Sequence, residues 1–253
     1  MTSHAISGLS GVSIVLPCHD EAENIERAIA EATAAAERVA DAHEVLVVDD
    51  GSDDATRSLA DAAAATDPRV RVLVHPENRG YGAALRTGIA AARLEWVFVT
   101  DADLQFDLAE LEGVVPLAGD HDFLAGWRIA RADPVHRRVN AAAWNAVVHR
   151  ACGVTLRDVD CAFKLVRRDL VQELPLTAEG AMVSTELVVR AAQAGARIAE
   201  VGVHHRPRTA GTASGASPRV VLRAFRELRA LRAQLRAEAA PGPSPGRARP
   251  RVA

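Results

Sequence analysis

The sequence contains little cysteine, lysine or aromatic residue. Only three cysteines and one lysine occur among its 253 residues, and aromatic side chains make up 4%. The cysteines have no CxxC spacing, which excludes a disulfide framework and common zinc-site patterns and is typical of a reducing compartment. No apolar run approaches the roughly 20 residues of a membrane-spanning helix, and the first residues lack the basic and apolar regions of a secretory signal. We therefore expect a cytoplasmic protein, either free or peripheral at the inner face of the cell membrane.

Charge is distributed unevenly along the chain. The formal net charge is −3, but the segment from His204 onward has eleven arginines and two acids, a net +9, which leaves −12 for residues 1–203. Two interpretations stay open for the basic end: an arginine-rich solvated tail, or a surface for an anionic partner such as lipid headgroups or nucleic acid. Apolar residues make up 49% of the chain, which excludes wholesale disorder and allows a sizeable core.

Short apolar runs alternate with helix-forming segments in the first half. The runs are rich in β-branched residues and predict buried strands at Val12–Leu16, Val45–Val48, Val70–Val74 and Trp96–Val99. The alanine-rich segments between them predict helices at Ala22–Ala40, Asp54–Ala65 and Gly80–Ala92. This alternation predicts an α/β fold with a mostly parallel central sheet flanked by helices. Such sheets bind their ligands beyond the carboxyl ends of the strands.

The second half is less regular. It predicts a helix at Pro134–Ala151, a strand at Cys161–Val166, a helix at Ser184–Ala194 and a strand at Arg197–Val203. A loop without periodicity follows from His204 to Pro218. Proline then opens a helix over 218–239, and the proline- and glycine-rich residues 240–253 predict a disordered tail.

Polar residues follow each of the first four predicted strands, at Pro17–Asn24, Asp49–Asp54, Asn78–Gly82 and Asp101–Gln105. Asp101 and Asp103 are two residues apart at a strand end, so their side chains can point the same way. A Mg²⁺ or Mn²⁺ ion held by one or two carboxylates and a substrate diphosphate suits this pair. Each motif alone also fits a surface turn, but their occurrence at consecutive strand ends favours a binding site. No GxGxxG follows the first strand and no P-loop is present, which excludes dehydrogenase and P-loop functions.

Taken together, the motifs resemble those of family 2 glycosyltransferases of the GT-A fold. The resemblance is strongest to the branch that includes dolichol-phosphate mannosyltransferases and bacterial polyprenyl-phosphate glycosyltransferases. The matching stretches are Val15–Asn24, Val48–Thr56, Asn78–Leu85, Asp101–Gln105, Gly126–Arg128, Asp160–Lys164, Glu200–Val203 and Arg208–Gly211. The resemblance implies a glycosyltransferase domain over 1–217, with a nucleotide-binding half at about 12–105 and an acceptor half at about 106–217.

The resemblance also implies roles for individual residues. The residues that would bind the nucleotide sugar are Pro17, His19, Glu21, Val48, Asp50, Asp101, Ala102, Asp103 and Arg128. The metal would be held by Asp101, Asp103 and Gln105, and the catalytic residues would be Asp103, Arg128 and Arg208. Arg208 matches the arginine of a closing loop whose usual lysine is absent here, and Arg206 or Arg219 are the alternatives for that charge. Lys164 belongs either to the site or to a strand as an exposed charge.

The function that the resemblance implies is inverting transfer of a hexose from a nucleotide diphosphate sugar of the GDP-mannose or UDP-glucose type. Mg²⁺ or Mn²⁺ is the implied cofactor, and polyprenyl phosphate at the cytoplasmic membrane face is the implied acceptor. With a second pKa of about 6, a phosphate acceptor is largely dianionic at neutral pH and needs cations rather than a base. The available cations are Arg128, Arg137, Arg138, Arg206 and Arg208.

Two alternatives stay open. A soluble hydroxyl acceptor would need a general base, for which Glu186 is the candidate, although a carboxylate in a first helical turn is favourable without any catalytic role. The other alternative is a non-catalytic protein that binds sugar nucleotides. A processive polysaccharide synthase is excluded because the QxxRW signature is missing.

The C-terminal helix carries an apolar stripe made of Val221, Phe225, Leu228, Leu231 and Leu235. Arginines at 223, 226, 229 and 236 flank this stripe. Such a helix can lie in a membrane interface beside a lipid-borne acceptor, or it can pack on the domain or form a homodimer. Nucleic-acid binding is disfavoured because Phe225 is the only aromatic residue there that could stack on bases.

Overall fold

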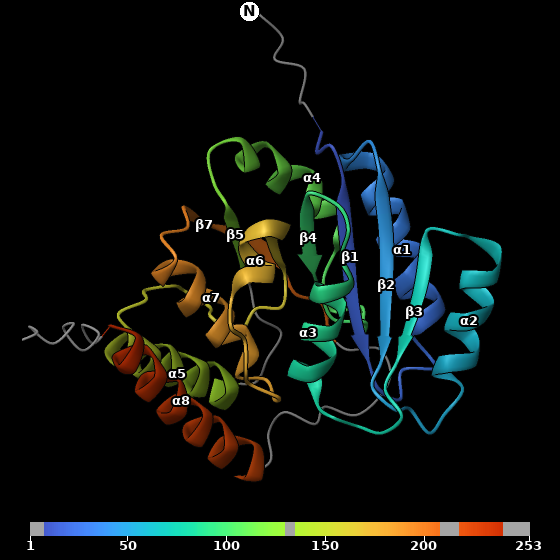
Figure 1. The fold of residues 1–253 in the computed structure, drawn as a ribbon. Helices are drawn as coiled ribbons and strands as arrows, with labels where there is room; N and C mark the ends of the chain where they lie inside the picture. Colours follow the sequence, from blue (N-terminus) through green and yellow to red (C-terminus); the bar gives the residue numbers. More distant parts are fainter. Residues whose placement is uncertain (1–7, 130–134, 208–217, 240–253) are drawn as a thin grey trace, which may run out of the picture.

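The computed structural model describes residues 8–129, 135–207 and 218–239. A seven-stranded sheet lies at its centre with helices on both sides (Figure 1), so the predicted α/β fold is confirmed. The predicted tail at 240–253 and most of the loop predicted at 204–218 lie outside the described residues.

The first half alternates strands and helices as predicted. Its elements are β1 (Val12–Cys18), α1 (Ile25–Val39), β2 (His43–Asp49), α2 (Thr56–Thr66), β3 (Val70–Val74), α3 (Tyr81–Ala91) and β4 (Trp96–Val99). Strands β3 and β4 have the predicted bounds. The chain between β1 and α1 forms an extended polar loop before the helix begins at Ile25.

The second half contains more elements than the sequence predicted. They are η1 (Leu108–Glu110), α4 (Leu111–Val114), η2 (Val115–Gly119), β5 (Phe123–Ile129), α5 (Val135–Cys152), β6 (Lys164–Arg167), α6 (Arg168–Glu173), α7 (Val183–Gln193), β7 (Ile198–His204) and α8 (Pro218–Ala239). Strand β5 was missed because Gly126 and Arg128 interrupt its apolar pattern. This strand is buried because it lies between β6 and β7 in the sheet.

The strands follow the order β3-β2-β1-β4-β6-β5-β7. All neighbouring pairs are parallel except those of β6, which runs antiparallel to both β4 and β5. Because β6 is reversed, it begins at the same edge of the sheet where β4 and β5 end. The segment that leads into β6 is thereby brought to the carboxyl-end edge of the parallel strands.

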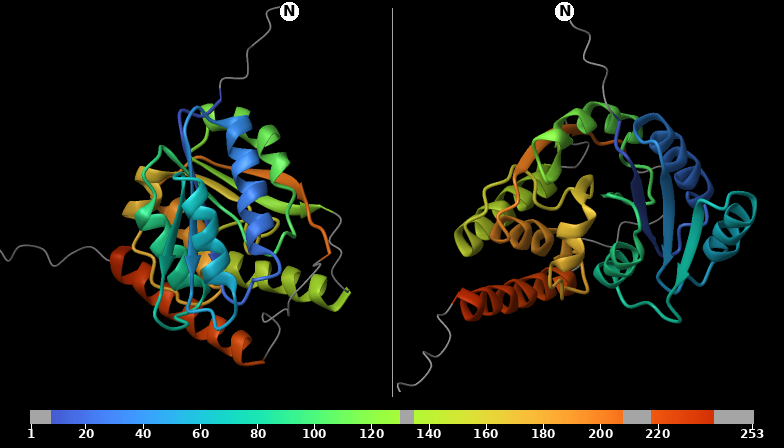
Figure 2. Two further views of the ribbon diagram at one scale, coloured as in Figure 1. Left: turned by 90° about the vertical axis from the view of Figure 1, so that its right-hand side faces the viewer. Right: turned by 45° about the horizontal axis from the view of Figure 1, so that its top comes forward.

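The two faces of the sheet pack against different helices (Figure 2). In β1, Ile14 and Leu16 face a cluster that includes α1 and α4, whereas Val15 faces a second cluster that includes α3 and α7. This alternation follows from the period of two in strand side chains. Strands β1, β2 and β4 are therefore buried on both faces, as their continuous apolar runs indicated.

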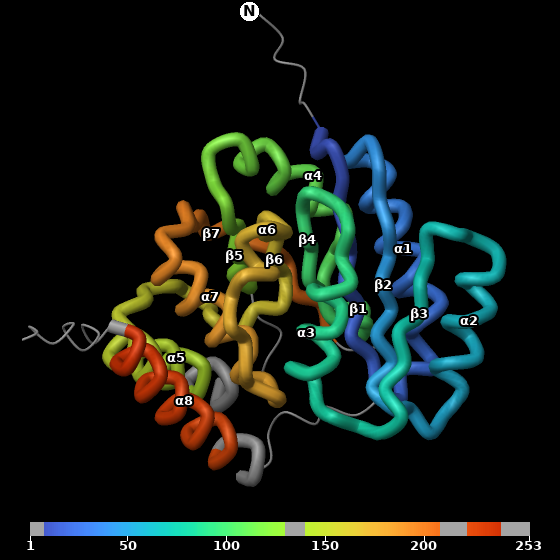
Figure 3. Tube along the Cα trace, viewed as in Figure 1, coloured from blue at the N-terminus to red at the C-terminus, as the bar shows by residue number. Residues whose placement is uncertain are grey.

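Helix α8 packs on the second of these clusters through its C-terminal half. Leu228, Leu231 and Leu235 are buried there, and α8 runs beside α5 at one end of the molecule (Figure 3). The Phe225 ring of α8 meets the Trp144 ring of α5 edge-on, with centroids 5.6 Å apart. The expectation that this stripe packs on the domain is thus confirmed for its three leucines. None of the described helices is long and apolar enough to cross a membrane.

Candidate active site

Three of the four polar clusters meet at one edge of the sheet because β1, β2 and β4 are parallel neighbours. In the β1–β2 register, Pro17 lies opposite Val48 and Cys18 opposite Asp49. The Asp50 amide continues this pairing and donates to the Cys18 carbonyl at 2.9 Å. Pro17 and Val48, two of the predicted nucleoside contacts, are therefore adjacent and buried.

Hydrogen bonds join the loop after β1 to the loop after β2. Asp20 has a left-handed φ of 53°, its amide donates to Ser52 Oγ at 3.0 Å, and its Oδ1 accepts from the Asp53 amide at 2.9 Å. The Glu21 amide donates to Thr56 Oγ1 at 2.8 Å. A non-glycine residue in this backbone region is uncommon and often marks a functional site. These bonds fix the conformation of the loop after β1. That loop contains His19 and Glu21, which are also predicted nucleoside contacts.

Asp50 anchors the loop that precedes α3. It is 3% exposed, and its carboxylate accepts from the amides of Arg79 at 3.0 Å and Gly80 at 2.7 Å. His75 Nδ1 lies 2.6 Å from Asp50 Oδ1, and His75 Nε2 lies 2.9 Å from Thr87 Oγ1. A carboxylate has about four acceptor positions, so three of these are engaged within the protein. The predicted contact of Asp50 with the nucleoside stays a prediction.

The Asp101–Ala102–Asp103 segment follows β4 and is held in an unusual turn. Leu104, directly after it, has a left-handed φ of 61°, and Asp103 accepts from the Gln105 amide at 3.1 Å. Ala102 is buried, and Asp103 is 9% exposed. Burial raises the pKa of Asp101, while Tyr81, Lys164 and Arg128 oppose this rise and Glu21 adds to it. Asp101 is thus the point where residues from both halves of the chain meet.

The Asp101 and Asp103 pair fits a divalent ion. Oδ1 of Asp101 is buried and has no hydrogen-bond partner of normal geometry among the described residues, which leaves an acceptor that a cation would satisfy. The described part of the chain has no group of three or more His, Cys, Asp or Glu side chains that could hold an ion. The two carboxylates of Asp101 and Asp103 suit Mg²⁺ or Mn²⁺, which are usually held by one or two carboxylates together with substrate phosphates.

Arg128 of β5 is fixed by Asp158. Its Nε and Nη2 donate to the two carboxylate oxygens of Asp158 at 2.7 and 2.9 Å, and the two side chains are 15% and 6% exposed. This bidentate pair holds the guanidinium in one orientation and, against the effect of burial, raises its pKa. The remaining N–H groups of Arg128 can serve an anion near Asp101.

Lys164 is buried, contrary to the interpretation of it as an exposed charge on a strand. Its side chain is 2% exposed, and its ammonium donates to the carbonyls of Val159 at 3.2 Å and of Cys161. Burial lowers its pKa. The sequence could not indicate this because the burial comes from tertiary contacts: Lys164 lies between Val99 of β4 and Ala125 of β5 in the sheet. Through these hydrogen bonds, Lys164 stabilises the segment that contains Asp158.

Gln105 joins the two halves of the site. Its side-chain amide nitrogen Nε2 donates to the backbone carbonyl of Arg206 at 3.1 Å. Its backbone carbonyl accepts from the backbone amide of Arg206 at 2.7 Å. The guanidinium of Arg206 pairs with Asp107 at 2.5 Å. Metal binding by Gln105 stays a prediction. Arg208, and the side chains of Arg137, Arg138 and Arg219, lie outside the described residues.

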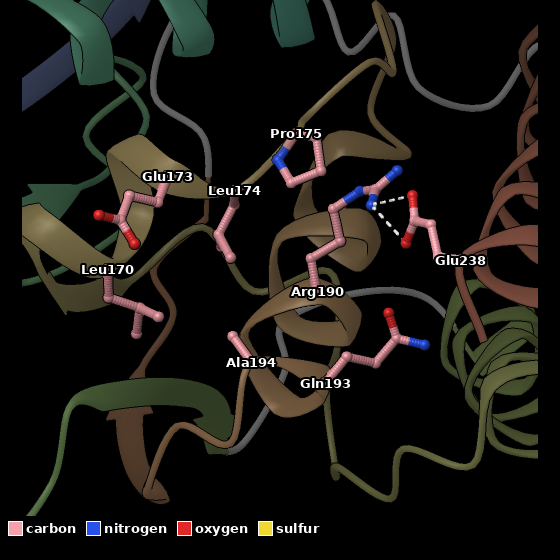
Figure 4. Close-up of a pocket in the computed structure, with 8 residues that line it drawn as sticks. All are labelled: Leu170, Glu173, Leu174, Pro175, Arg190, Gln193, Ala194 and Glu238. Atoms are coloured by element: carbon pink, nitrogen blue, oxygen red, sulfur yellow. Dashed lines mark hydrogen bonds and ion pairs between the residues drawn. The ribbon is translucent and has the colours of Figure 1, made fainter. Parts of the chain in front are cut away.

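Glu186 is not arranged as a general base. It is 1% exposed, and it accepts from the Thr177 amide and hydroxyl, the Ala178 amide and Arg190 Nε, at 2.7 to 3.0 Å. These four bonds occupy all its acceptor positions. Arg190 also reaches Glu238 of α8 at 3.3 Å, beside a cavity of about 280 Å³ that lies between α6, α7 and α8 (Figure 4). Glu186 therefore stabilises the fold, as its first-turn position also allowed.

Three side chains that the sequence did not single out belong to this site. Asp158 orients Arg128, His75 contacts Asp50, and Tyr81 faces Asp101. Tyr81 stands inside the Asn78–Gly82 motif and is the only tyrosine of the chain, which is the signal that could have identified it. The other two depend on contacts between residues about 25 to 30 positions apart.

Comparisons with solved structures identify the fold. The fold is similar to that of glucosyl-3-phosphoglycerate synthase from Mycobacterium tuberculosis in complex with uridine diphosphate, with a TM-score of 0.66 at 23% identity over 87% of this chain and 80% of that one. It is equally similar to mannosyl-3-phosphoglycerate synthase from Rubrobacter xylanophilus, with a TM-score of 0.66 at 18% identity over 94% and 78% of the two chains. The fold is that of GT-A glycosyltransferases.

The sequence then gives the family. The model described as "Glycosyl transferase family 2" matches residues 13–175, and the chain belongs to this family. It is 37% identical over 207 residues to glycosyltransferase AglD of Haloferax volcanii, covering 78% of this chain and 33% of AglD. It is 32% identical over 212 residues to the undecaprenyl-phosphate 4-deoxy-4-formamido-L-arabinose transferase of Pseudomonas fluorescens, covering 83% and 61% of the two. The chain thus spans about a third of the first relative and less than two thirds of the second.

Proposed function

We propose that the protein is an inverting glycosyltransferase that moves a hexose from a nucleotide diphosphate sugar to polyprenyl phosphate, at the cytoplasmic face of the membrane. The observation that carries the proposal is the buried Asp101 Oδ1 two residues from the buried Asp103, at the sheet edge where both halves of the chain meet. The names of the undecaprenyl-phosphate transferases support the lipid phosphate as acceptor. GDP-mannose or UDP-glucose is the type of donor we propose.

The residues around Asp101 suit cleavage of a sugar–diphosphate bond. The leaving diphosphate gains negative charge in the transition state, which preorganised cations stabilise. A divalent ion at Asp101 and Asp103 would supply a Lewis acid for this charge, and Gln105 is proposed to complete that site. Arg128, oriented by Asp158, binds the diphosphate or the acceptor phosphate, and Arg208 is proposed to add a second cation. The acceptor attacks the anomeric carbon opposite the leaving group, which inverts its configuration.

A radiolabelled donor separates the two classes of acceptor. The protein is incubated with labelled UDP-glucose or GDP-mannose and Mn²⁺, with and without polyprenyl phosphate, and then extracted into organic solvent. We expect label in the organic phase only when polyprenyl phosphate is present. Label that stays in water as a new glycoside would contradict the lipid acceptor, and no transfer from either donor would contradict the enzyme.

A soluble hydroxyl acceptor is the second candidate, and one carboxylate favours it. Asp160 accepts from Thr185 Oγ1 at 3.3 Å, and desolvation of its carboxyl by the surrounding residues raises its pKa, while Lys164 and Arg128 oppose this rise. A carboxylate with a raised pKa can serve as a general base. With a hydroxyl acceptor, removal of this carboxylate would stop transfer, whereas a phosphate acceptor would tolerate it.

The exposed part of α8 is proposed as the contact with the membrane surface. Leu222 and Phe225 are 60% and 42% exposed, and Arg226 and Arg229 beside them are exposed too. Apolar side chains flanked by arginines match an anionic lipid interface. The buried leucines of the stripe are unavailable for this role, so the contact is confined to the N-terminal half of the helix.

Substitution of Leu222 tests this contact. We expect Leu222→Ser to weaken cosedimentation with phosphatidylglycerol vesicles roughly tenfold, because a partly buried leucine contributes about 1.5 kcal/mol or more. Leu117→Ser is the matched control, since Leu117 is 37% exposed on η2, and it should bind vesicles as the unsubstituted protein does. Equal binding by both variants would contradict the contact.

A further inference from the structure

Tyr81 lies at the start of α3, with its side chain against the Asp101 turn. Its hydroxyl is buried and lies close to the Asp101 carboxylate and the Ser184 hydroxyl. Burial and the charges of Asp101 and Asp103 raise the pKa of Tyr81 well above its usual value, while the Ser184 hydroxyl of α7 opposes this. The phenol therefore faces the two carboxylates of the proposed metal site.

Two buried polar groups thus face each other, the Tyr81 hydroxyl and the Asp101 carboxylate, and a hydrogen bond between them contributes to the pKa of both. One can donate a hydrogen bond and the other can accept one. The Tyr81 hydroxyl gives this buried carboxylate a donor from the start of α3, so it can fix the direction in which the Asp101 oxygens point.

We propose that Tyr81 is a positioning residue of the metal site, whose hydroxyl donates to the Asp101 carboxylate when that carboxylate binds a divalent ion. This inference rests on the proposed function, because it takes Asp101 as a metal ligand. Carboxylates that bind metals are usually hydrogen-bonded in turn, and loss of such an outer partner typically weakens metal affinity 10- to 100-fold. Tyr81 would therefore act on the ion only through Asp101.

The backbone around Tyr81 holds the ring in place. Gly82, the next residue, donates its amide to the Glu179 carbonyl at 2.8 Å, and a Cβ on Gly82 would lie 2.3 Å from the Ala178 carbonyl oxygen. The start of α3 therefore packs closely against the segment before α7, and this contact leaves no room for a side chain at position 82. This contact leaves the phenol hydroxyl in one position relative to Asp101.

Tyr81→Phe tests the inference because it removes only the hydroxyl. We expect Mn²⁺ affinity in the presence of UDP or GDP, measured from the electron paramagnetic resonance signal of free Mn²⁺, to fall roughly tenfold. Nucleotide affinity in EDTA should not change. A purely structural tyrosine would lower the unfolding midpoint in EDTA without weakening Mn²⁺ binding.

Ser184→Ala is the matched control, since it removes the other hydroxyl near Tyr81, and it should leave Mn²⁺ affinity unchanged. The inference is overturned if Tyr81→Phe binds Mn²⁺ as tightly as the unsubstituted protein, or if Ser184→Ala causes the same loss. An unsubstituted protein that binds no Mn²⁺ with either nucleotide would instead overturn the proposed function, and the inference with it.

The single tyrosine gives a second measurement that is independent of activity. Protein labelled with 3-fluorotyrosine has one fluorine resonance, because Tyr81 is the only tyrosine. With UDP or GDP present, Mn²⁺ should broaden this resonance and Mg²⁺ should only shift it. A sharp resonance at saturating Mn²⁺ would place the ion away from Tyr81 and overturn the inference, while the proposed function would stand.

Discussion

Asp103→Asn is expected to reduce the rate of sugar transfer about 10²- to 10³-fold, the loss typical of removing one transition-state charge stabiliser. The substitution removes the negative charge but keeps an oxygen that can accept from the Gln105 amide. The turn after β4 should therefore keep its shape while the affinity for the ion falls. The measurement is transfer from a labelled donor at saturating Mn²⁺.

The control for this substitution is Asp41→Asn. Asp41 is exposed just before β2, at the opposite edge of the sheet, so its loss should leave transfer unchanged. Circular dichroism should give the same spectrum and unfolding midpoint for both variants. Turnover by Asp103→Asn close to that of Asp41→Asn would remove the metal assignment.

Glu186→Ala is expected to lower the free energy of unfolding by about 3–5 kcal/mol, the cost of removing one partner of a buried ion pair. Arg190 is 4% exposed and would keep its charge in the core. The amides of Thr177 and Ala178 would also lose their acceptor. Unfolding in urea, followed by circular dichroism, measures this change.

A matched ion pair on the surface provides the comparison. Arg57 and Asp61 have the same i,i+4 spacing on α2, but their side chains are 60% and 55% exposed. Asp61→Ala should change the free energy of unfolding by no more than about 0.5 kcal/mol. Similar losses in the two variants would show that Glu186 is not a buried structural partner and would reopen its role as a base.

The fold of the first half was predictable because its signals are local. Strands β3 and β4 are bounded by polar or turn residues at the positions where they end, and alanine-rich helices separate the strands. Strand β5 was not predictable in this way. Its FLAGWRI sequence has no strand period, and only pairing with β6 and β7 makes it a strand.

The candidate site was predictable only where a motif carries its own chemistry. The two acids at 101 and 103 could be identified from their spacing, and the structure buries one oxygen of Asp101 at the sheet edge. The pairing of Arg128 with Asp158 and the burial of Lys164 could not, because both depend on which strand lies next to which. Sequence spacing gives no information on such tertiary contacts.

The reversed strand β6 makes the two halves of the chain inseparable. It hydrogen-bonds to β4 from the first half and to β5 from the second. A fragment that stopped after Gln105 would leave Trp96–Val99, an apolar strand, as a bare edge open to pairing with other molecules. The segment up to Gln105 is therefore not a portable module, and an exchange of the later segment between relatives has to carry β6 along with its partner strands.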